Sequence, residues 1–378
     1  MNGPVLPPPL ALLAELTHRC PLKCFYCSNP LALERRHSEL DTNEWRRVLT
    51  EAAALGILQV HLSGGEPMAR VDLAELVRHA ADLKLYTNVI TAGVLLSDTA
   101  MAALSAARVD HIQLSFQDSR AASADYIGGY AGGHDRKLAA AQRITAAGLP
   151  LTLNFVVHRL NAERVAEMID MGEPLGAARV EIAHAQYHGW ALRNRRGLLP
   201  SRAQLDAVTQ VVEKARERLK GKLVIDYVMP DYYASRPKAC MGGWGRRFIN
   251  ISPSGKALPC HAAETLPGLD FPSVREHSLA EIWRQSPAFQ KFRGTQWMPE
   301  PCRSCERREL DWGGCRCQAM ALLGDSSATD PVCTKSSDHY VVEEALAELS
   351  ADGELSARVM APAGKSSRQR ADTRAPGR

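Results

Sequence analysis

The stretch LALLAELTHRCPLKCFYC (residues 10–27) joins an apolar run to three closely spaced cysteines. Leu10–Leu16 is short and apolar, which predicts a buried strand. Cys20, Cys24 and Cys27 follow it with the spacing C-x3-C-x2-C, on a loop at the strand's carboxyl end, where α/β folds bind ligands. Three thiolates can hold three irons of a [4Fe–4S] cube and leave the fourth iron open. A structural zinc site requires four ligands, and His18 is the nearest residue that could supply the fourth.

A strand-then-helix rhythm continues from this stretch through the first half of the chain. Further apolar runs predict strands at Leu58–Leu62, Leu85–Ile90, His111–Phe116, Leu151–Val157 and Arg179–Ala183. The intervening segments have the apolar spacing of helices, at 42–55, 71–83, 97–107, 135–147, 161–171 and 202–219. Six such units predict an α/β fold with a parallel sheet and right-handed crossovers. Periodicity alone does not distinguish an open sheet from a curved partial barrel.

The composition changes after about residue 222, where Gly, Pro, Trp, Arg and Cys become frequent. Phe248–Ser252 and Lys256–Pro259 flank a Pro-Ser-Gly turn, which predicts a β-hairpin. Ser278–Gln285 predicts a short capped helix, and residues 300–332 are expected to be mostly loop. Because such a segment builds little core, we expect metal sites to stabilise it.

These patterns divide the chain into five parts. They are an N-terminal segment (1–9), a barrel (10–221), a bridging segment (222–235), a Cys-rich domain (236–345) and a flexible tail (346–378).

Composition and charge exclude several classes of protein. The chain has 378 residues, a net charge of +4 and 45% hydrophobic residues, which is typical of a folded protein and gives no indication of nucleic-acid binding. It has no apolar run of the ~18 residues that a membrane helix needs, and its N-terminus does not resemble a secretory signal. We therefore expect a cytoplasmic protein, in which ten cysteines favour metal or cluster ligation over disulfides.

The first cysteine motif, with Tyr26 before its last cysteine, resembles that of the radical S-adenosylmethionine (SAM) superfamily. The resemblance implies a partial (β/α)6 barrel of the TIM type, a catalytic [4Fe–4S] cluster on Cys20, Cys24 and Cys27, and SAM as the source of a 5′-deoxyadenosyl radical. Gly64-Gly65-Glu66-Pro67 resembles the segment that contacts the SAM amino group in this family. By their positions, further SAM contacts are expected at Tyr26, Thr87, Asn88, Ser115, Gln117 and Asn154. Each of these six could also be an ordinary strand-end or core residue.

The seven remaining cysteines resemble the SPASM domain, which follows the barrel in many peptide-modifying radical SAM enzymes. The resemblance implies two auxiliary iron–sulfur clusters. The first would use Cys240, Cys260, Cys315 and Cys317; because the last two are only two residues apart, a [2Fe–2S] unit is an alternative there. The second would use Cys302, Cys305, Cys333 and Asp311, which stands where the family has a cysteine. Two zinc sites, and Asp311 as a bystander, are the alternatives that the residues leave open.

Three segments narrow the resemblance further: Ser28–Leu31, Glu39–Trp45 and Gln186–Ala191. Together with Asp311, they resemble the PqqA peptide cyclases of pyrroloquinoline quinone biosynthesis, although His188 stands where a second tyrosine is expected. The resemblance implies a carbon–carbon bond between a Glu γ-carbon and a Tyr ring carbon within the PqqA precursor peptide, in the first step of that pathway. His184, Tyr187 and His188 become candidate polar contacts. The implied partners are PqqA, a separate PqqD-type peptide chaperone and a flavodoxin-like electron donor.

Two alternative functions remain compatible with the sequence. One is another SPASM-type peptide or protein maturase, of the thioether-forming or sulfatase-maturase-like kind. The other, from a different class, is a binding protein whose cysteines hold only zinc.

Anaerobic reconstitution, with iron and sulfide counted per chain, separates the enzymes from the zinc protein. A multi-cluster radical SAM enzyme is expected to hold roughly ten or more irons and to release 5′-deoxyadenosine from SAM under reducing conditions. Zinc without sulfide, together with intact SAM, would show that the cysteines only stabilise the fold.

Overall fold

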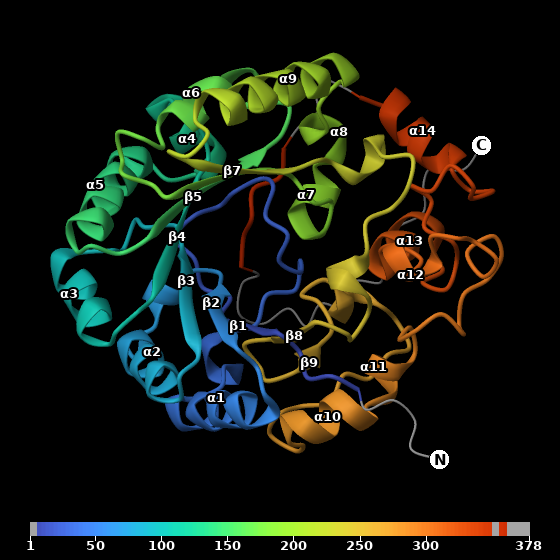
Figure 1. The fold of residues 1–378 in the computed structure, drawn as a ribbon, viewed down its shortest axis with the longest axis horizontal. Coiled ribbons are helices and arrows are strands. Elements are labelled where there is room, and N and C mark those ends of the chain that lie inside the picture. Colours follow the sequence, from blue (N-terminus) through green and yellow to red (C-terminus); the bar gives the residue numbers. More distant parts are fainter. Residues whose placement is uncertain (1–5, 350–354, 361–378) are drawn as a thin grey trace.

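The computed structural model describes residues 6–349 and 355–360, and its centre is a curved sheet of nine strands in the order β7-β6-β5-β4-β3-β2-β1-β8-β9 (Figure 1). Its strands are β1 (Ala11–Thr17), β2 (Gln59–Gly64), β3 (Tyr86–Thr91), β4 (His111–Phe116), β5 (Leu151–Val157), β6 (Arg179–His184), β7 (Val224–Val228), β8 (Phe248–Ile251) and β9 (Ala257–Leu258). All neighbouring pairs are parallel except β8 and β9. The curved parallel sheet confirms the predicted α/β partial barrel.

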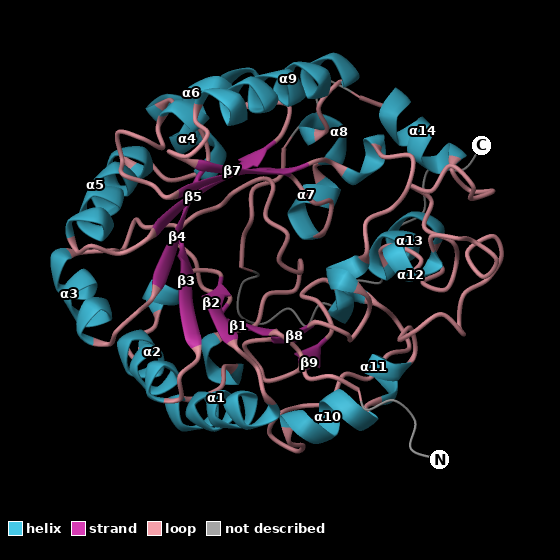
Figure 2. Cartoon of the chain, in the orientation of Figure 1, coloured by secondary structure: helices cyan, strands magenta, loops and turns pink. Residues whose placement is uncertain are grey.

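Helices cover the convex side of the sheet (Figure 2). They include α1 (Thr42–Leu55), α2 (Leu73–Asp82), α3 (Asp98–Ala106), α4 (Ala121–Gly128), α5 (Gly133–Ala146), α6 (Val165–Asp170) and α9 (Arg202–Arg218). The short helices α7 (Gly189–Arg193) and α8 (Arg195–Leu198) lie on the inner side of this ring. Three of the helices on the convex side begin at capping residues that satisfy free backbone N–H groups: Asp41 accepts from Glu44, Ser97 from Ala100 and Ser201 from Gln204. In the described ranges, no helix is both long and apolar enough to cross a membrane.

The strands and helices predicted from periodicity are present, with bounds that differ by a few residues at most. The strands at 111–116 and 151–157 and the helix at 42–55 have the predicted bounds. The sequence did not reveal β7, which pairs with β6 inside the expected bridging segment. Val224–Val228 contains a charged residue and is exposed at its start, so its apolar signal is weak.

The second half of the chain joins the same sheet. The predicted hairpin is confirmed as β8 and β9, and β8 pairs in parallel with β1. The helices are α10 (Leu279–Gln285), α11 (Pro287–Gln290), α12 (Arg308–Asp311), α13 (Arg316–Leu323) and α14 (Tyr340–Ala347). Residues 300–332 are mostly loop, as expected, with α12 and α13 as two short helices within them. The expected helix at 278–285 is confirmed, and the hydroxyl of Ser278 caps it.

One apolar core connects the two halves. Leu279, Trp283 and Phe289 are fully buried in the same cluster as Leu12 of β1 and Trp45 of α1. The Cys-rich domain therefore shares its core with the barrel, because α10 lies against α1.

The described part of the expected tail is ordered against the rest of the chain. α14 extends to Ala347, and residues 355–360 run back into the interior of the barrel, where Leu355 and Ala357 pack in an apolar cluster (Figure 1). This contradicts a flexible tail for these residues. The parts of the expected N-terminal segment and tail at 1–5, 350–354 and 361–378 lie outside the described residues.

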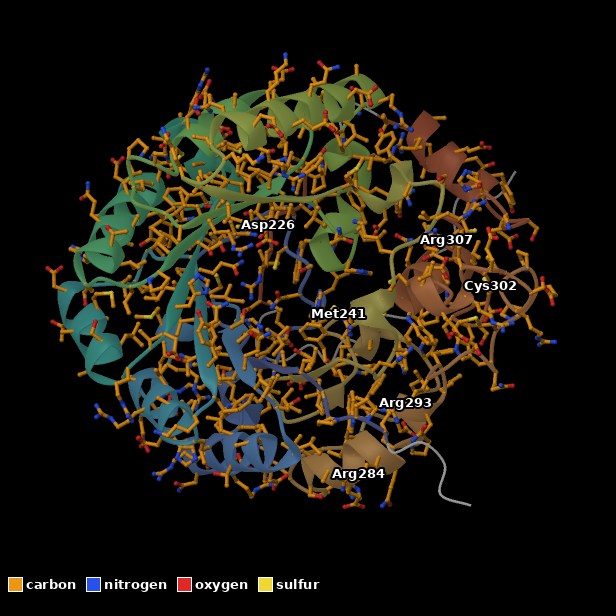
Figure 3. All side chains as sticks on the ribbon, in the orientation of Figure 1. Asp226, Met241, Arg284, Arg293, Cys302 and Arg307 are labelled. Carbon is orange, nitrogen blue, oxygen red and sulfur yellow. The ribbon has the colours of Figure 1, made fainter. Side chains whose placement is uncertain are left out.

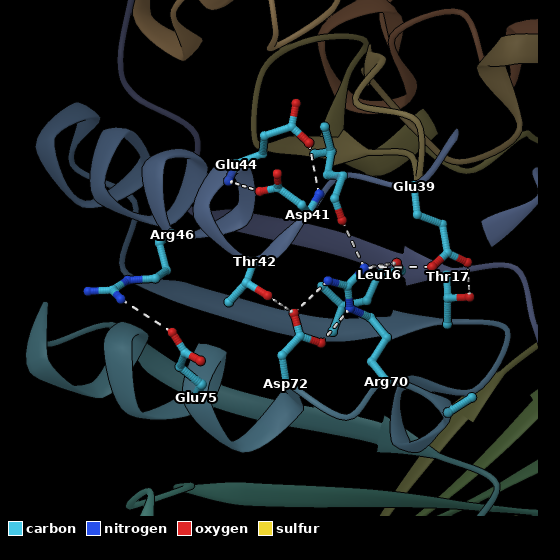
Figure 4. A network of polar contacts seen from close by, with 12 residues as sticks. Leu16, Thr17, Glu39, Asp41, Thr42, Glu44, Arg46, Arg70, Asp72 and Glu75 are labelled. Atoms are coloured by element: carbon cyan, nitrogen blue, oxygen red, sulfur yellow. Dashed lines mark hydrogen bonds and ion pairs between the residues drawn. The ribbon is translucent and has the colours of Figure 1, made fainter. Parts of the chain in front are cut away.

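A polar network fixes the connection between β1, α1 and the end of β2 (Figure 4). The Arg70 guanidinium donates to the carbonyl oxygens of Leu16 and Leu40 and pairs with Asp72 at 2.6 Å. The hydroxyl of Thr42 donates to the same Asp72 carboxylate at 2.6 Å. Because Arg70 and Asp72 are partly or fully buried, these charge-assisted bonds hold the start of the cysteine loop on the sheet.

Because the two halves share one core, a cavity in α10 is expected to destabilise the barrel as well. We expect Leu279→Ala to lower the free energy of unfolding by about 2–5 kcal/mol. Leu310→Ala, at a side chain that is 64% exposed on α12, is the control with little expected effect. Anaerobic scanning calorimetry should show one transition that moves to lower temperature. Two transitions, of which only one moves, would contradict a shared core.

Candidate functional site

A cavity of about 290 Å³ lies where the loop after β1 meets the carboxyl ends of β2 to β6. Eight of the residues predicted from the sequence line it: Cys20, Cys24, Tyr26, Cys27, Gly64, Gly65, Ser115 and Gln117. This is the edge at which parallel strands gather their ligand contacts. The structure therefore brings the three cysteines and half of the expected SAM contacts to one place.

The three thiols line one cavity, but they are not placed to hold a single metal ion. In the described parts of the chain, no three His, Cys, Asp or Glu side chains converge as a single metal ion requires. The proposed zinc ligand His18 points elsewhere, because its Nδ1 accepts the backbone N–H of Glu34 at 2.9 Å and it does not line the cavity. A cubane cluster needs more widely spaced thiolates than zinc does, so this donor set fits an iron–sulfur cluster.

Burial makes these thiols weak acids in the metal-free chain. It raises the pKa of Cys20 to about 12 and that of Cys24 to about 11. At neutral pH these two thiols therefore keep their protons until iron displaces them, so that cluster assembly releases protons.

Gly64 and Gly65 allow β2 to approach the cysteine loop. The N–H of Gly65 donates to the carbonyl of Thr17, and that of Glu66 donates to the carbonyl of Arg19 at 2.8 Å. A β-carbon on Gly64 would lie 2.3 Å from the Thr17 oxygen, and one on Gly65 would lie 2.5 Å from the Arg19 oxygen. Only glycine fits at either position, because backbone atoms cannot move aside as a flexible side chain does.

Glu66 fixes the end of β3 rather than pointing freely into the cavity. One of its carboxylate oxygens accepts from the N–H of Met68 at 3.0 Å and from the Thr91 hydroxyl at 2.7 Å. The other accepts from the N–H of Ala92 at 2.8 Å. Glu66 is fully buried, and Pro67 beside it opens the short helix Pro67–Ala69. The carboxylate thus holds Thr91 and Ala92 in the cavity wall.

A second network holds Tyr26. The Gln117 amide donates to the Tyr26 hydroxyl at 3.0 Å, and the buried Lys137 of α5 donates to the Gln117 side chain and to the Ser115 carbonyl. Burial lowers the pKa of Lys137 to about 8. Sequence reasoning missed Lys137, because a lysine inside a predicted amphipathic helix is usually on its solvated face.

Three of the expected SAM contacts lie elsewhere. Thr87 is at the amino end of β3, where its N–H and hydroxyl bind the Asp110 carboxylate at 2.8 Å. The Asn88 amide lies 3.1 Å from the His61 ring, and the Asn154 amide donates to Glu181 at 2.8 Å. None of the three lines the cavity, so the structure does not bring them together with the cysteines, and their SAM contacts stay predictions. Thr87 and Asn88 were assigned to the end of a strand that runs on to Thr91, and Thr91 and Ala92 occupy the expected place.

The Gln186–Ala191 segment closes on the cysteine loop. The N–H groups of Trp190 and Ala191 donate to the carbonyl of Cys27 at 3.0 and 3.2 Å. Gly189 has a φ of +53°, and a β-carbon there would lie 2.0 Å from the carbonyl oxygen of Asn29. The segment therefore positions the third cysteine.

The three candidate polar contacts around this segment have different environments. His184 lines the cavity, and burial lowers its pKa to about 4. Gln186, which was not one of the three candidates, lines the cavity as well. Tyr187 is buried in an apolar cluster against Tyr232, with ring centroids 5.2 Å apart. His188 meets His261 edge-on at 6.1 Å. Only His184 of the three candidates contacts the cavity.

The first group of auxiliary cysteines is assembled around a second apolar cluster. Cys260 and Cys317 have their sulfur atoms 3.9 Å apart, and Cys240 is within hydrogen-bonding reach of Cys260 and Cys315. In Figure 3, Met241, the neighbour of Cys240, lies on the side of this domain that faces the barrel. The structure thus brings together the four cysteines that the sequence grouped.

The second group is assembled further from the barrel, where Figure 3 labels Cys302 and Arg307. Cys302, Cys305, Cys333 and Asp311 line one small cavity of about 10 Å³. This volume holds about one water molecule, so a cluster there requires the side chains to move apart. Asp311 is buried; it accepts from the N–H of Gly313 at 3.2 Å and lies 3.7 Å from Arg307.

Asp330, which sequence reasoning missed, connects the two groups. It is buried, lines the second cavity, and accepts the N–H groups of Cys315 at 2.7 Å and Val332 at 3.0 Å. The Gln318 amide donates to it at 2.9 Å. Burial raises the pKa of Asp330 to about 6. One carboxylate thus fixes the backbone beside ligands of both auxiliary groups.

Comparison with sequence families agrees with this geometry. The profile of the radical SAM superfamily matches residues 14–172, and that of an iron–sulfur cluster-binding (SPASM) domain matches residues 240–306. A PqqA peptide cyclase of Granulibacter bethesdensis is 65% identical over 90% of this chain and 91% of its own length. Another, of Gluconobacter oxydans, is 62% identical over 90% of this chain and 94% of its own.

Solved structures show the same fold at low sequence identity. SuiB of Streptococcus suis bound to S-adenosylmethionine has a TM-score of 0.73 and 20% identity, over 87% of this chain and 78% of SuiB. SuiB has also been solved bound to its precursor peptide SuiA. The protein anSMEcpe with bound AdoMet has a TM-score of 0.61 and 14% identity, over 90% of this chain and 97% of its own.

Removal of the Asp330 charge is expected to weaken both auxiliary sites. In Asp330→Asn, the amide turns an NH₂ group toward at least one of the N–H donors, which costs about 1–3 kcal/mol at a buried site. We expect iron and sulfide per chain to fall while SAM cleavage continues at the first cysteine motif. Asp325→Asn, at an exposed position of the same loop, is the control. Full iron content in Asp330→Asn would show that the carboxylate does not organise these ligands.

Proposed function

We propose the function of this chain from its family, because it belongs to the PqqA peptide cyclases of the radical SAM superfamily. The proposed reaction joins a Glu γ-carbon to a Tyr ring carbon in the PqqA precursor peptide. This is a step of pyrroloquinoline quinone biosynthesis. Family membership decides against the zinc-only binding protein and favours the cyclase over other SPASM-type maturases.

One observation in the structure supports the chemistry above all others. The three thiols of the first motif lie in the wall of a cavity at the carboxyl edge of the sheet, beside Gly64 and Gly65. When bound there, the iron–sulfur cluster and SAM supply a one-electron cleavage that produces a 5′-deoxyadenosyl radical. The chain's own contribution is to hold these groups and to exclude water from them.

The residues around the cavity divide this work. Cys20, Cys24 and Cys27 would ligate the cluster, and the Gln186–Ala191 segment holds the third of them through the Cys27 carbonyl. Tyr26, fixed by Gln117, offers a ring for the adenine to pack against. Thr91 and Ala92, which Glu66 positions in the cavity wall, lie where the polar end of SAM would bind.

The reaction balances only with an electron acceptor. Formation of the bond between the Glu γ-carbon and the Tyr ring carbon removes two hydrogens from the peptide. One leaves the Glu γ-carbon as a hydrogen atom. The other leaves the Tyr ring as a proton and one electron. Cys240, Cys260, Cys315 and Cys317 would hold the auxiliary cluster on the side of the domain that faces the barrel, and such a cluster would supply an acceptor for this electron.

The remaining partners are part of the same proposal. A PqqD-type chaperone would deliver the peptide, and a flavodoxin-like protein would reduce the first cluster. Both fit a protein that acts in the cytoplasm on a ribosomal peptide, where low-potential donors are available.

Mass spectrometry of PqqA after anaerobic incubation with SAM, a reductant and the reconstituted protein tests the assignment. We expect a product lighter by two hydrogens, with the cross-link between one Glu and one Tyr in its fragments. Deuterium at the Glu γ-carbon should appear in 5′-deoxyadenosine. A matched PqqA in which that Tyr is Ala is the control, and it should form no product of the same linkage because it lacks the ring. SAM cleavage without any change in PqqA would assign the protein to another peptide.

A further inference from the structure

The segment 355–360 brings a charged residue to the first cysteine motif from the far end of the chain. Asn194 holds it in place: its amide donates to the Ser356 carbonyl at 2.8 Å, and the Ser356 N–H donates back to the Asn194 side-chain oxygen at 2.8 Å. The same amide also donates to the Phe25 carbonyl, in the cysteine motif itself. The N–H of Arg358 then donates to the Lys23 carbonyl at 3.3 Å.

Arg358 is buried beside the three thiols. Its side chain lines the same cavity as Cys20, Cys24 and Cys27, and the residue is 4% exposed. One guanidinium nitrogen donates to the His18 carbonyl, and Nε has no hydrogen-bond partner. Among the described residues, no carboxylate forms an ion pair with this guanidinium.

An unpaired guanidinium in such a place is costly. A buried charge without a partner strongly destabilises a fold, and a counter-charge in the same site removes this cost. The three cysteines lie in the wall of the same cavity as Arg358, where their thiolates would supply that counter-charge once they ligate a cluster. Neutral thiols do not pair with a cation, whereas a thiolate-ligated cluster does.

We propose that Arg358 is the counter-charge of the cluster held by Cys20, Cys24 and Cys27, and that it raises the reduction potential of that cluster. The proposal rests on the cluster assignment made above. Reduction adds one negative charge, and an adjacent positive charge in a site of low dielectric stabilises the reduced form more than the oxidised form. The residues that follow α14 thereby tune the cluster that the start of the chain binds.

The test compares Arg358→Gln, Arg358→Lys and, as a matched control, Arg78→Gln, which removes one positive charge from an exposed position on α2. Each full-length protein is reconstituted anaerobically, and iron and sulfide are counted. The midpoint potential of the first cluster is then measured without SAM by a redox titration followed by electron paramagnetic resonance. The signal that changes when SAM is added to a parallel sample identifies this cluster.

We expect the midpoint of Arg358→Gln to shift to more negative values, while Arg358→Lys stays closer to the unchanged protein and Arg78→Gln does not move. If Arg358→Gln fails to load the first cluster, loading in Arg358→Lys still supports the proposal, whereas loss in both overturns it. An unchanged midpoint with full iron also overturns it, including the case in which only SAM binding weakens. A shifted midpoint in a protein that does not modify PqqA would refute the proposed function and leave this inference standing.

Discussion

The backbone pairing between the end of β2 and the residues before Cys20 is the constraint on which the site depends. Thr17 and Arg19 give their carbonyls to Gly65 and Glu66, at a separation that no side chain at Gly64 or Gly65 would permit. Because β1 and β2 are also paired along their length, the cysteine loop leaves the sheet in one direction only. Other hydrogen bonds hold the loop further along. Arg70 donates to the Leu16 carbonyl, Trp190 and Ala191 donate to the Cys27 carbonyl, and Asn194 donates to the Phe25 carbonyl.

Residues near the carboxyl end of the described chain meet the first cysteine loop. The first motif lies near the amino terminus, yet Arg358 and the segment after β6 supply its walls. Asp330 has a similar role at the auxiliary cysteines. Its carboxylate accepts the backbone N–H of Cys315, and its backbone carbonyl accepts the N–H of Cys333 at 2.9 Å. The first motif and the backbone beside Cys315 are thus held by residues from other parts of the chain.

Sequence patterns predicted the fold well, because the strands of a parallel sheet are short apolar runs between helices of strong periodicity. They also predicted the cysteines, whose spacing carries chemistry directly. They failed where a position depends on the exact length of a strand or on contacts with distant residues. Thr87 was assigned to the end of β3 but lies near its start. β7 was not predicted, because its apolar run is weak and contains Asp226. Lys137, Asp330 and Arg358 were missed because nothing local separates a buried ionic residue from a solvated one; only the packing around it does.

The parallel pairing of β8 with β1 has a consequence for the order in which the protein can fold during synthesis. Ala11 pairs with Phe248, so one edge of β1 stays unpaired until a strand roughly 240 residues later in the chain has been synthesised. Until that partner leaves the ribosome, the nascent barrel presents an unpaired strand edge, which other chains can pair with. The cysteine loop stands at the end of the same strand. The walls of the first site come from residues 20–186, except for Arg358, which is among the last described residues to be synthesised.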